Sequence, residues 1–318
     1  MHYCTYFLIP TFAGKKLIMN NRKVQYFRSE SLLMITAVIW GFAFVAQRAG
    51  MEFIGPFTYN GIRFALGSLV LIPVISWRAK LPGRNADAIS TPVPVSFWLA
   101  GIIAGVILFG GASLQQVGIT QTTAGKAGFI TGLYVIIVPI IGIFKKQHAG
   151  KALWVGALLA LSGMYFLSIT GNFELSKGDF LVFLSAFLWA AHVQVIDHFS
   201  GRVDVIKLAV LQFAICSVAS IFVAVLTESI TLSSILQAAI PILYGGILSV
   251  GIAYTLQVVA QQKAHPSHAA IILSLETVFA AIGGWLILDE RLSARALAGC
   301  ALMLAGMLIA QLYKSKAT

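Results

Sequence analysis

The stretch TTAGKAGFITGLYVIIVP, residues 122–139, places a Gly-Lys pair at the head of a long apolar run. Such a pair belongs either to a phosphate-binding loop or to a helix that enters a lipid bilayer. A phosphate-binding loop needs a glycine five positions before the Gly-Lys pair and a Ser or Thr directly after it, because the hydroxyl binds magnesium. Thr120 and Ala127 occupy these two positions. The stretch is therefore interpreted as an apolar membrane-crossing helix with a lysine near its first residue.

The composition of the whole chain agrees with this interpretation. Of its 318 residues, 58% are hydrophobic and 10% are charged, whereas soluble domains carry about 25% charged residues. A soluble fold of this length would lack the polar side chains to cover its surface. Apolar runs of about 20 residues, each long enough to cross about 30 Å of hydrocarbon, recur along the chain. We therefore predict an all-α integral membrane protein.

Hydropathy predicts ten transmembrane helices. In chain order, the predicted spans are 31–49, 57–77, 96–116, 124–144, 152–169, 179–198, 206–227, 238–260, 268–288 and 294–312. An even number of spans puts both termini on one side of the membrane. Sixteen of the 22 Lys and Arg residues lie on that side, five lie on the opposite side, and Arg63 lies within a span. Because basic loops stay in the cytoplasm, both termini are predicted to be cytoplasmic, including an N-terminal segment, 1–30.

The formal net charge of +11 does not indicate a nucleic-acid partner. The basic residues lie in short connections between apolar runs, where they orient a membrane protein. The 3 cysteines are scattered without a CxxC pattern, so neither a disulfide framework nor a metal site is predicted, and no cofactor is expected. The expected partners are the lipid bilayer and a small molecule. The sequence leaves the choice between a monomer and a homodimer open.

The two halves of the chain resemble each other. At an offset of 149 residues, LLMITAVIWGF (32–42) aligns with LVFLSAFLWAA (181–191), and this alignment pairs Trp40 with Trp189. Such similarity would mean little in two apolar stretches alone, but it continues through later spans in the same order.

In the later spans the offset is near 143 residues. Gln115 pairs with Gln257, and GALLALSGM (156–164) aligns with GCALMLAGM (299–307). Each half holds five spans, so the second half must enter the membrane from the opposite side. We therefore predict two inverted five-helix repeats, an architecture typical of secondary transporters whose binding site lies near the midplane between the repeats. The predicted repeats cover residues 31–170 and 179–313.

Two blocks of sequence resemble those of a known family. The first half contains TTAGKAGFITGLYVIIVPI (122–140), and the second contains HAAIILSLETVFAAIGGWLILDERLSARALAGCALMLAGMLI (268–309), in which an apolar SLE helix is followed by a DER turn and a Gly-rich closing helix. Over about residues 31–312 the chain resembles the EamA-like family of the drug/metabolite transporter superfamily. The resemblance implies a ten-helix carrier of the bacterial inner membrane, of a kind that often exports amino acids or related metabolites. The family usually has Pro after the Glu, where this chain has Thr277, so the shape of the ninth helix is left open.

Two charged residues lie within predicted spans, where a charge is costly and normally faces a cavity or a partner. Glu276, near the middle of the ninth span, is a candidate to carry a proton or to bind a substrate amine. Its alternative role is that of a structural acid bonded to a neighbouring helix. Arg63, in the second span, is a candidate to pair with Glu276 or to bind a substrate carboxylate. A structural role for Arg63 is favoured, because its repeat mate is the uncharged Gln212.

Two further residues with ionisable side chains, a lysine and a histidine, are expected close to the predicted cavity. Lys126, at the outer end of the fourth span, is a candidate to attract anionic groups at the cavity mouth, or else its side chain reaches the membrane interface. His192 shares a helix face with Trp189, and a free imidazole changes its charge near neutral pH. It is a candidate to contact a substrate, and a hydrogen bond between helices is the equal alternative.

The remaining candidates are uncharged. Gln115 and Gln257 correspond across the repeat, so one pseudo-symmetric site would receive an amide from each half. The aromatic and hydroxyl candidates are Trp40, Trp189, Tyr134 and Thr131, for which packing between helices is the alternative.

Three residues of the fourth span are candidate hinge positions. Gly128 and Gly132 have a spacing that lets neighbouring backbones approach closely. Pro139 frees a backbone carbonyl and is expected to bend the helix where alternating access requires bending.

Together these features predict a secondary transporter of small organic metabolites, driven by the substrate gradient or by protons through Glu276 or His192. An intramembrane enzyme would need HExxH, GxSxG or paired intramembrane aspartates, which the sequence lacks, so no enzymatic activity is expected. A membrane receptor or assembly protein without transport is the alternative function.

Overall fold

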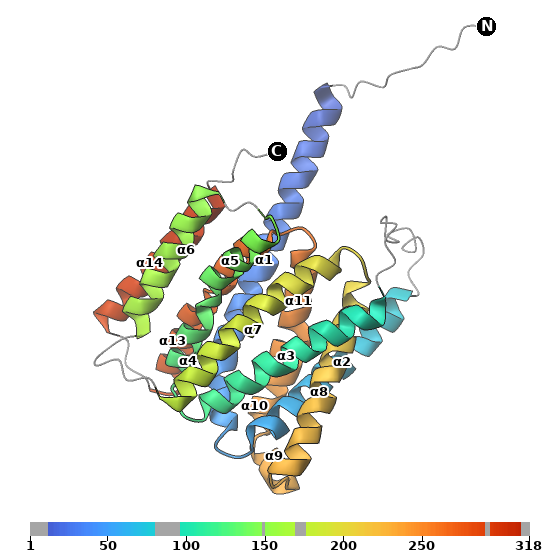
Figure 1. The fold of residues 1–318 in the computed structure, drawn as a ribbon, viewed down its shortest axis with the longest axis vertical. Helices are drawn as coiled ribbons and strands as arrows, with labels where there is room; N and C mark the ends of the chain where they lie inside the picture. The colour runs from blue at the N-terminus through green and yellow to red at the C-terminus, as the bar shows by residue number, and fades with distance from the viewer. Residues whose placement is uncertain (1–11, 80–95, 148–149, 169–175, 290–292, 313–318) are drawn as a thin grey trace, which may run out of the picture.

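The computed structural model describes residues 12–79, 96–147, 150–168, 176–289 and 293–312, and these residues form helices joined by turns and short connections (Figure 1). In chain order, the elements are α1 (Phe12–Gly50), α2 (Pro56–Ala79), α3 (Phe97–Ile119), α4 (Ala124–Gly132), α5 (Tyr134–Phe144), α6 (Lys151–Ser168), α7 (Lys177–Ser200), α8 (Val205–Thr227), α9 (Leu232–Gln237), α10 (Ala239–Leu243), the π-helix η2 (Tyr244–Tyr254), α11 (Thr255–Gln261), α12 (Pro266–Leu273), α13 (Glu276–Ile287) and α14 (Ala294–Leu312).

The described helices are those of a membrane protein. Eight helical segments are long and apolar enough to cross a bilayer, and two further apolar segments, Lys151–Phe166 and Leu297–Ala310, are shorter. Each of these segments overlaps one of the predicted spans. Large apolar side chains on the outer surface are exposed, among them Phe222 at 65% and Ile240 at 82%, as expected of a surface that faces lipid. The prediction of an all-helical, multi-span membrane protein is confirmed.

The fourth predicted span is interrupted at Leu133, which separates α4 from α5. There the backbone N–H groups of Leu133 and Ile136 donate to carbonyls three residues earlier, at 3.2 and 3.1 Å, so the chain tightens for one turn. Pro139, the residue expected to bend this span, lies inside α5. The interruption instead follows directly after Gly132, whose missing side chain leaves room for neighbouring helices.

The ninth predicted span is interrupted in the same way, between α12 and α13. Leu275 N–H donates to the carbonyl of Ile272 at 3.2 Å, again three residues earlier. Glu276 is the first residue of α13, just as Tyr134 is the first residue of α5. The two interruptions lie 142 residues apart in the sequence.

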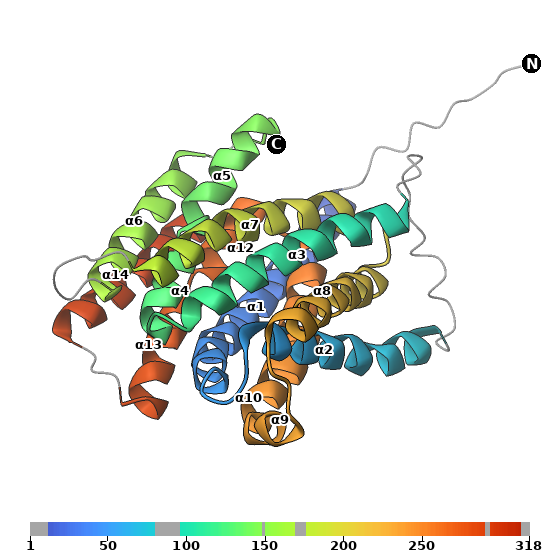
Figure 2. The ribbon, with the colours of Figure 1, turned by 60° about the horizontal axis from the view of Figure 1, so that its bottom comes forward.

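The helices α6 and α14 form a pair at one side of the molecule, and they lie side by side in both ribbon views (Figures 1 and 2). Their backbones approach at two pairs of glycines. A Cβ on Gly156 would lie 2.6 Å from the carbonyl oxygen of Gly306, and a Cβ on Gly163 would lie 2.5 Å from that of Gly299. Only glycine permits this separation.

The remaining helices surround the interior of the molecule. The helix α1 contacts η2, α11, α12 and α13, while α3 lies along α7 and α2 lies along α8. The eighth predicted span is irregular, because α10, η2 and α11 follow one another without a turn between them. π-Helical segments are rare and often occur at functional sites. Here η2 contributes to the cavity described next.

Candidate functional site

A cavity lies in the interior, where α1, α2, α3 and α7 meet the two interrupted spans and the π-helix η2. Nine of the ten residues that the sequence singles out for the substrate pathway line it. They are Trp40, Arg63, Gln115, Thr131, Tyr134, Trp189, His192, Gln257 and Glu276. These nine residues come together at one cavity from eight different helical elements. Lys126 is the one residue of the ten that lies elsewhere.

Aromatic rings form one wall of the cavity around Tyr254, the last residue of η2. The ring centroid of Trp40 lies 4.5 Å from that of Tyr254, and those of Trp189 and His192 lie 6.1 and 6.2 Å from it. Trp40 Nε1 also donates a hydrogen bond to the backbone carbonyl of Ser249 at 3.2 Å. Tyr254 was missed in the sequence, where its spacing of three residues from Gln257 is the signal that places both on one helix face.

The two interrupted spans contribute Tyr134 and Glu276, which are 3% and 4% exposed. The Glu276 carboxyl lies close to the Tyr134 hydroxyl, which has no hydrogen-bond partner of normal geometry. Because Glu276 begins α13, its carboxylate lies at the end of a helix where the partial charge is positive. This position gives a buried acid a favourable environment and leaves it in contact with the cavity.

Several buried polar atoms of the cavity lining have no hydrogen-bond partner in the described structure. These atoms are Gln47 Oε1, Tyr134 Oη, Trp189 Nε1 and Gln257 Oε1. A buried polar group without a partner costs about 1–3 kcal/mol, and such groups are rare in folded proteins. Of the twelve such atoms in the described residues, these four line the cavity, where a polar ligand would supply their missing partners. Gln115 differs from its repeat mate, because its amide donates to Thr131 Oγ1 at 2.9 Å.

His192 forms the hydrogen bond between helices that the sequence analysis named as its alternative. Its Nε2 lies 2.8 Å from Oε1 of Gln212 on α8, and both side chains are buried. The same imidazole also lines the cavity. Gln212, the repeat mate of Arg63, therefore positions a cavity residue rather than lining the cavity itself.

Arg63 is 2% exposed, and its guanidinium lies close to two aromatic rings. The carbon at the centre of its guanidinium lies 5.3 Å from the ring centroid of Tyr59 and 4.9 Å from that of Phe64. Its Nε donates to Oδ1 of Asn60 at 3.0 Å. The ion pair with Glu276, one of the candidate roles of Arg63, does not form, since the described ion pairs within 4.0 Å are Arg78–Asp204 and Lys126–Asp179. The two side chains line the same cavity without forming an ion pair.

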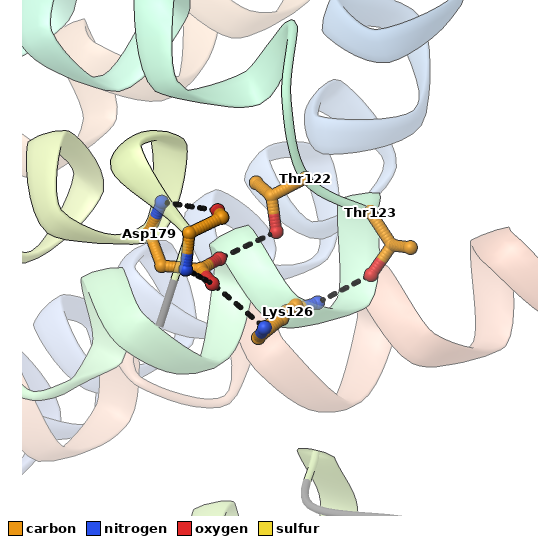
Figure 3. A network of polar contacts seen from close by, with 5 residues as sticks. Thr122, Thr123, Lys126 and Asp179 are labelled. Carbon is orange, nitrogen blue, oxygen red and sulfur yellow. Dashed lines mark hydrogen bonds and ion pairs between the residues drawn. The ribbon is translucent and has the colours of Figure 1, made fainter. Parts of the chain in front are cut away.

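Lys126 lies outside the cavity and joins two elements at their N-terminal ends (Figure 3). Its Nζ lies 2.7 Å from Oδ2 of Asp179, a carboxylate with no exposed area. The same carboxylate accepts hydrogen bonds from the hydroxyl of Thr122 at 2.8 Å and from the backbone N–H of Ser176 at 2.9 Å. Asp179 was missed in the sequence, although the spacing of Ser176 and Asp179 is that of a helix-capping box.

The predicted close approach at Gly128 and Gly132 involves α13. A Cβ on Gly128 would lie 3.2 Å from Cβ of Ala280, and a Cβ on Gly132 would lie 2.9 Å from Oγ1 of Thr277. Thr277 Oγ1 also donates a hydrogen bond to the carbonyl of Gly128 at 3.0 Å. The residue that departs from the family pattern therefore connects the two interrupted spans.

The sequence model of the EamA-like transporter family matches this chain twice, over residues 28–169 and 176–311. The chain belongs to the EamA-like transporter family. These EamA-like matches cover most of the chain, and they account for its apolar helices as those of a membrane transporter. Within the described residues, no group of three or more His, Cys, Asp and Glu side chains is placed to hold a metal ion.

Relatives of this EamA-like chain carry the names of transporters. An uncharacterized transporter of Archaeoglobus fulgidus is 31% identical over 283 residues, which cover 88% of this chain and 84% of the relative. A probable amino-acid metabolite efflux pump of Salmonella typhimurium is 24% identical over 288 residues, covering 87% and 93% of the two chains. A solved crystal structure is similar in fold, with a TM-score of 0.70 at 21% identity, and the similarity covers 89% of this chain and 96% of that one.

Proposed function

We propose that this EamA-like protein is a secondary transporter that exports small organic metabolites, such as amino acids or related or drug-like compounds, across the inner membrane by alternating access. The observation that carries this proposal is the interior cavity at the two interrupted spans. Its walls combine aromatic rings, amides, a guanidinium and a carboxyl group. Aromatic faces with a few polar groups suit an amphipathic small molecule better than a bare ion.

The cavity is too small for a metabolite in this conformation. Its volume is about 40 Å³, whereas one water molecule needs about 10–15 Å³ on the same measure. A metabolite would therefore enter only after the surrounding helices move apart. This requirement supports a cycle in which the site opens to one side of the membrane at a time.

We infer that the chain consists of two inverted five-helix repeats with ten spans, close to residues 31–170 and 179–313. The matched interruptions support this inference, since α4 and α12 begin 142 residues apart and so do α5 and α13. The glycine contacts support it as well. The pair Gly156–Gly306 becomes the pair Gly299–Gly163 when each residue is replaced by its mate at an offset of 143. Such exchange is what a twofold relation between the repeats requires.

Movement of one repeat against the other would break contacts at the side opposite to the termini. With both termini in the cytoplasm, the Lys126–Asp179 ion pair lies on the outer side. So does Glu228, at the end of α8, whose carboxylate accepts from the backbone N–H groups of Phe57 and Thr58 at 2.8 Å each. Both contacts join the first repeat to the second, so outward opening would separate them.

Transport into or out of vesicles tests the proposal directly. The purified protein, reconstituted into lipid vesicles, is expected to exchange radiolabelled members of a panel of amino acids, nucleosides and polyamines faster than protein-free vesicles. Proton coupling through Glu276 predicts that Glu276→Gln loses the pH dependence of uptake, and His192→Gln tests the alternative carrier. Equal transport by Glu276→Gln and wild type from pH 5 to pH 8 would rule out a proton role for Glu276. No transport of any panel member would contradict the proposed function.

A further inference from the structure

We propose that the cavity recognises its substrate by a free carboxylate, which binds end-on to the guanidinium of Arg63, and that a substrate amine is not required. The inference rests on the proposed transport function and names the chemical class that the site takes. That class is a monocarboxylate with an aromatic or large apolar portion. Arg63 is then the residue that determines specificity for the charged group.

The first step of the argument is the unbalanced charge of Arg63. The side chain is 2% exposed and lines the cavity, yet no Asp or Glu of the described chain lies within 4.0 Å of it. A buried charge is costly unless a partner compensates it. The rings of Tyr59 and Phe64 stabilise the cation, but no described hydrogen bond joins the guanidinium to either residue. The position is therefore favourable for a guanidinium and is incomplete without an anion.

The second step concerns which nitrogen atoms are left for a ligand. A guanidinium has five N–H donors, and Nε donates to Asn60. Asn60 is itself held in place, because its Nδ2 donates to the carbonyl of Ala112 at 3.1 Å. No described hydrogen bond uses the two terminal nitrogens. With Nε occupied and fixed, these nitrogens form the end of a planar fork, the arrangement that binds the two oxygens of a carboxylate.

The third step distinguishes a carboxylate from a phosphate. Arg63 is the one Lys or Arg of the described residues that lines the cavity, and Glu276 places an acid in the same space. A phosphate monoester carries about −1.5 to −2 charges near pH 7, more than a single guanidinium balances. A carboxylate carries one. The charges of the cavity therefore favour the carboxylate.

The fourth step concerns the rest of the substrate. Trp40, Tyr254 and Trp189 form a continuous set of rings, with centroids 4.5 and 6.1 Å apart across Tyr254. Phe64, which contacts the guanidinium, lies 6.1 Å from the same tyrosine. An apolar group attached to a carboxylate would therefore extend from Arg63 along these rings. The Nε1 of Trp189 and the Oε1 of Gln257 remain for its polar substituents.

Matched ligands test the inference on the wild-type protein. We would measure thermal stabilisation in detergent by indole-3-propionate, which has a carboxylate alone, by tryptamine, which has an amine alone, and by tryptophan, which has both. The panel also includes the corresponding acid, amine and amino acid with a phenyl or an isobutyl group in place of the indole. Phenyl phosphate tests recognition of a phosphate. A ligand that binds the folded state raises the melting temperature by mass action. The acids and amino acids are expected to stabilise, while the amines and phenyl phosphate are not.

Substitutions at Arg63 give the second measurement. Arg63→Gln is expected to weaken binding of indole-3-propionate about 10- to 150-fold, as the loss of hydrogen bonds to a charged group would do. Arg63→Lys keeps the charge without the fork and is expected to give an intermediate loss. Arg78→Gln is the control, because Arg78 lies outside the cavity and 4.0 Å from Asp204. Each variant is first checked for a single peak in size-exclusion chromatography.

Three results would overturn the inference. They are equal stabilisation of the wild type by tryptamine and indole-3-propionate, unchanged acid binding in a folded Arg63→Gln protein, and no stabilisation by any acid of the panel. If Arg63→Gln does not fold, the ranking of the ligands on the wild type decides the question alone. If vesicles with the protein take up tryptamine but none of the acids, the carboxylate requirement is rejected while the transport function is supported. The two proposals can thus fail separately.

Discussion

The ammonium of Lys126 lies 2.7 Å from the fully buried carboxylate of Asp179, and this ion pair joins α4 to α7. Asp179 also accepts from Thr122 and from the backbone of Ser176 (Figure 3). The carboxylate therefore joins two segments that are distant in sequence, residues 122–126 and 176–179. Because it has no access to solvent, it depends on these partners for its charge.

Removing the lysine should leave that charge partly uncompensated. We expect Lys126→Met to lower the stability of the protein by about 1.5–3 kcal/mol, the usual contribution of a hydrogen bond to a charged group. Asp179→Asn in the Lys126→Met background should recover part of the loss, since the buried group is then neutral. Thermal unfolding in detergent of the two single variants and the double variant measures the coupling. Additive effects of the two substitutions would show that the pair contributes no interaction energy.

Thr277 provides a second test, at the place where the two interrupted spans meet. Its hydroxyl donates to the carbonyl of Gly128 at 3.0 Å, and the side chain is completely buried. Thr277→Val keeps the shape and removes the donor, so it is expected to cost about 0.6–1.7 kcal/mol, the range found for hydrogen bonds between membrane helices. Thr277→Ser keeps the hydroxyl and serves as the matched control. The valine variant lacks the hydrogen bond and the serine variant lacks only the methyl group. If the valine variant melts at the wild-type temperature and the serine variant melts lower, the hydrogen bond does not contribute to stability.

The sequence predicted the spans and much of the cavity because both depend on local, repeated signals. Apolar length fixes where a helix can cross a bilayer. The internal repeat paired Trp40 with Trp189 and Gln115 with Gln257, and all four side chains line the cavity. Glu276 was found because an acid within an apolar span is costly. These predictions needed no knowledge of how the helices pack.

The residues that the sequence did not reveal depend on tertiary contacts. Tyr254 is one aromatic residue among many in an apolar chain until the rings of Trp40 and Trp189 are placed beside it. Asn60 becomes relevant only because it holds Arg63. A bend of the fourth span was expected at Pro139, since proline is a strong local signal, whereas the interruption at Leu133 was not predicted. Its actual position reflects the packing of Gly132 against Met164 and Thr277.

The contact between α6 and α14 provides a third test, because it depends on the absence of side chains. A Cβ on Gly163 would lie 2.5 Å from the carbonyl oxygen of Gly299. This oxygen belongs to the helix backbone, so it cannot move away by a side-chain rotation. Gly163→Ala is therefore expected to force the two helices apart and to cost about 1–3 kcal/mol, as overpacking does in other cores. Gly201→Ala is the control, since a Cβ there would meet nothing within 4 Å. Equal melting temperatures of the two variants would contradict the close helix contact.

The N-terminus of α12 predicts a pH dependence of stability. The ring nitrogen Nδ1 of His265 accepts a hydrogen bond from the backbone N–H of Ser267 at 3.3 Å, so the cap requires a neutral imidazole. Burial lowers the pKa of His265 below its ordinary value of 6.5, and Asp197 opposes this shift. A lowered pKa in the folded state means that the unfolded chain binds the proton more readily. The stability from the cap is therefore complete above pH 6.5 and is lost as the pH falls through the lowered pKa.

Replacing His265 by Asn tests this dependence, because asparagine is an effective N-cap that does not titrate. Between about pH 7.5 and about pH 5, the melting temperature of the wild type should fall further than that of His265→Asn. His265→Ala should be less stable than wild type at the higher pH by about 0.5–2 kcal/mol, the usual contribution of a cap, and should also lack the extra loss on acidification. Parallel curves for the wild type and His265→Asn would show that other groups, such as His198 or His268, cause any acid destabilisation. The helix α12 leads directly to the interruption before Glu276. Loss of the cap should therefore also speed hydrogen–deuterium exchange of the backbone amides in α12, which mass spectrometry measures peptide by peptide.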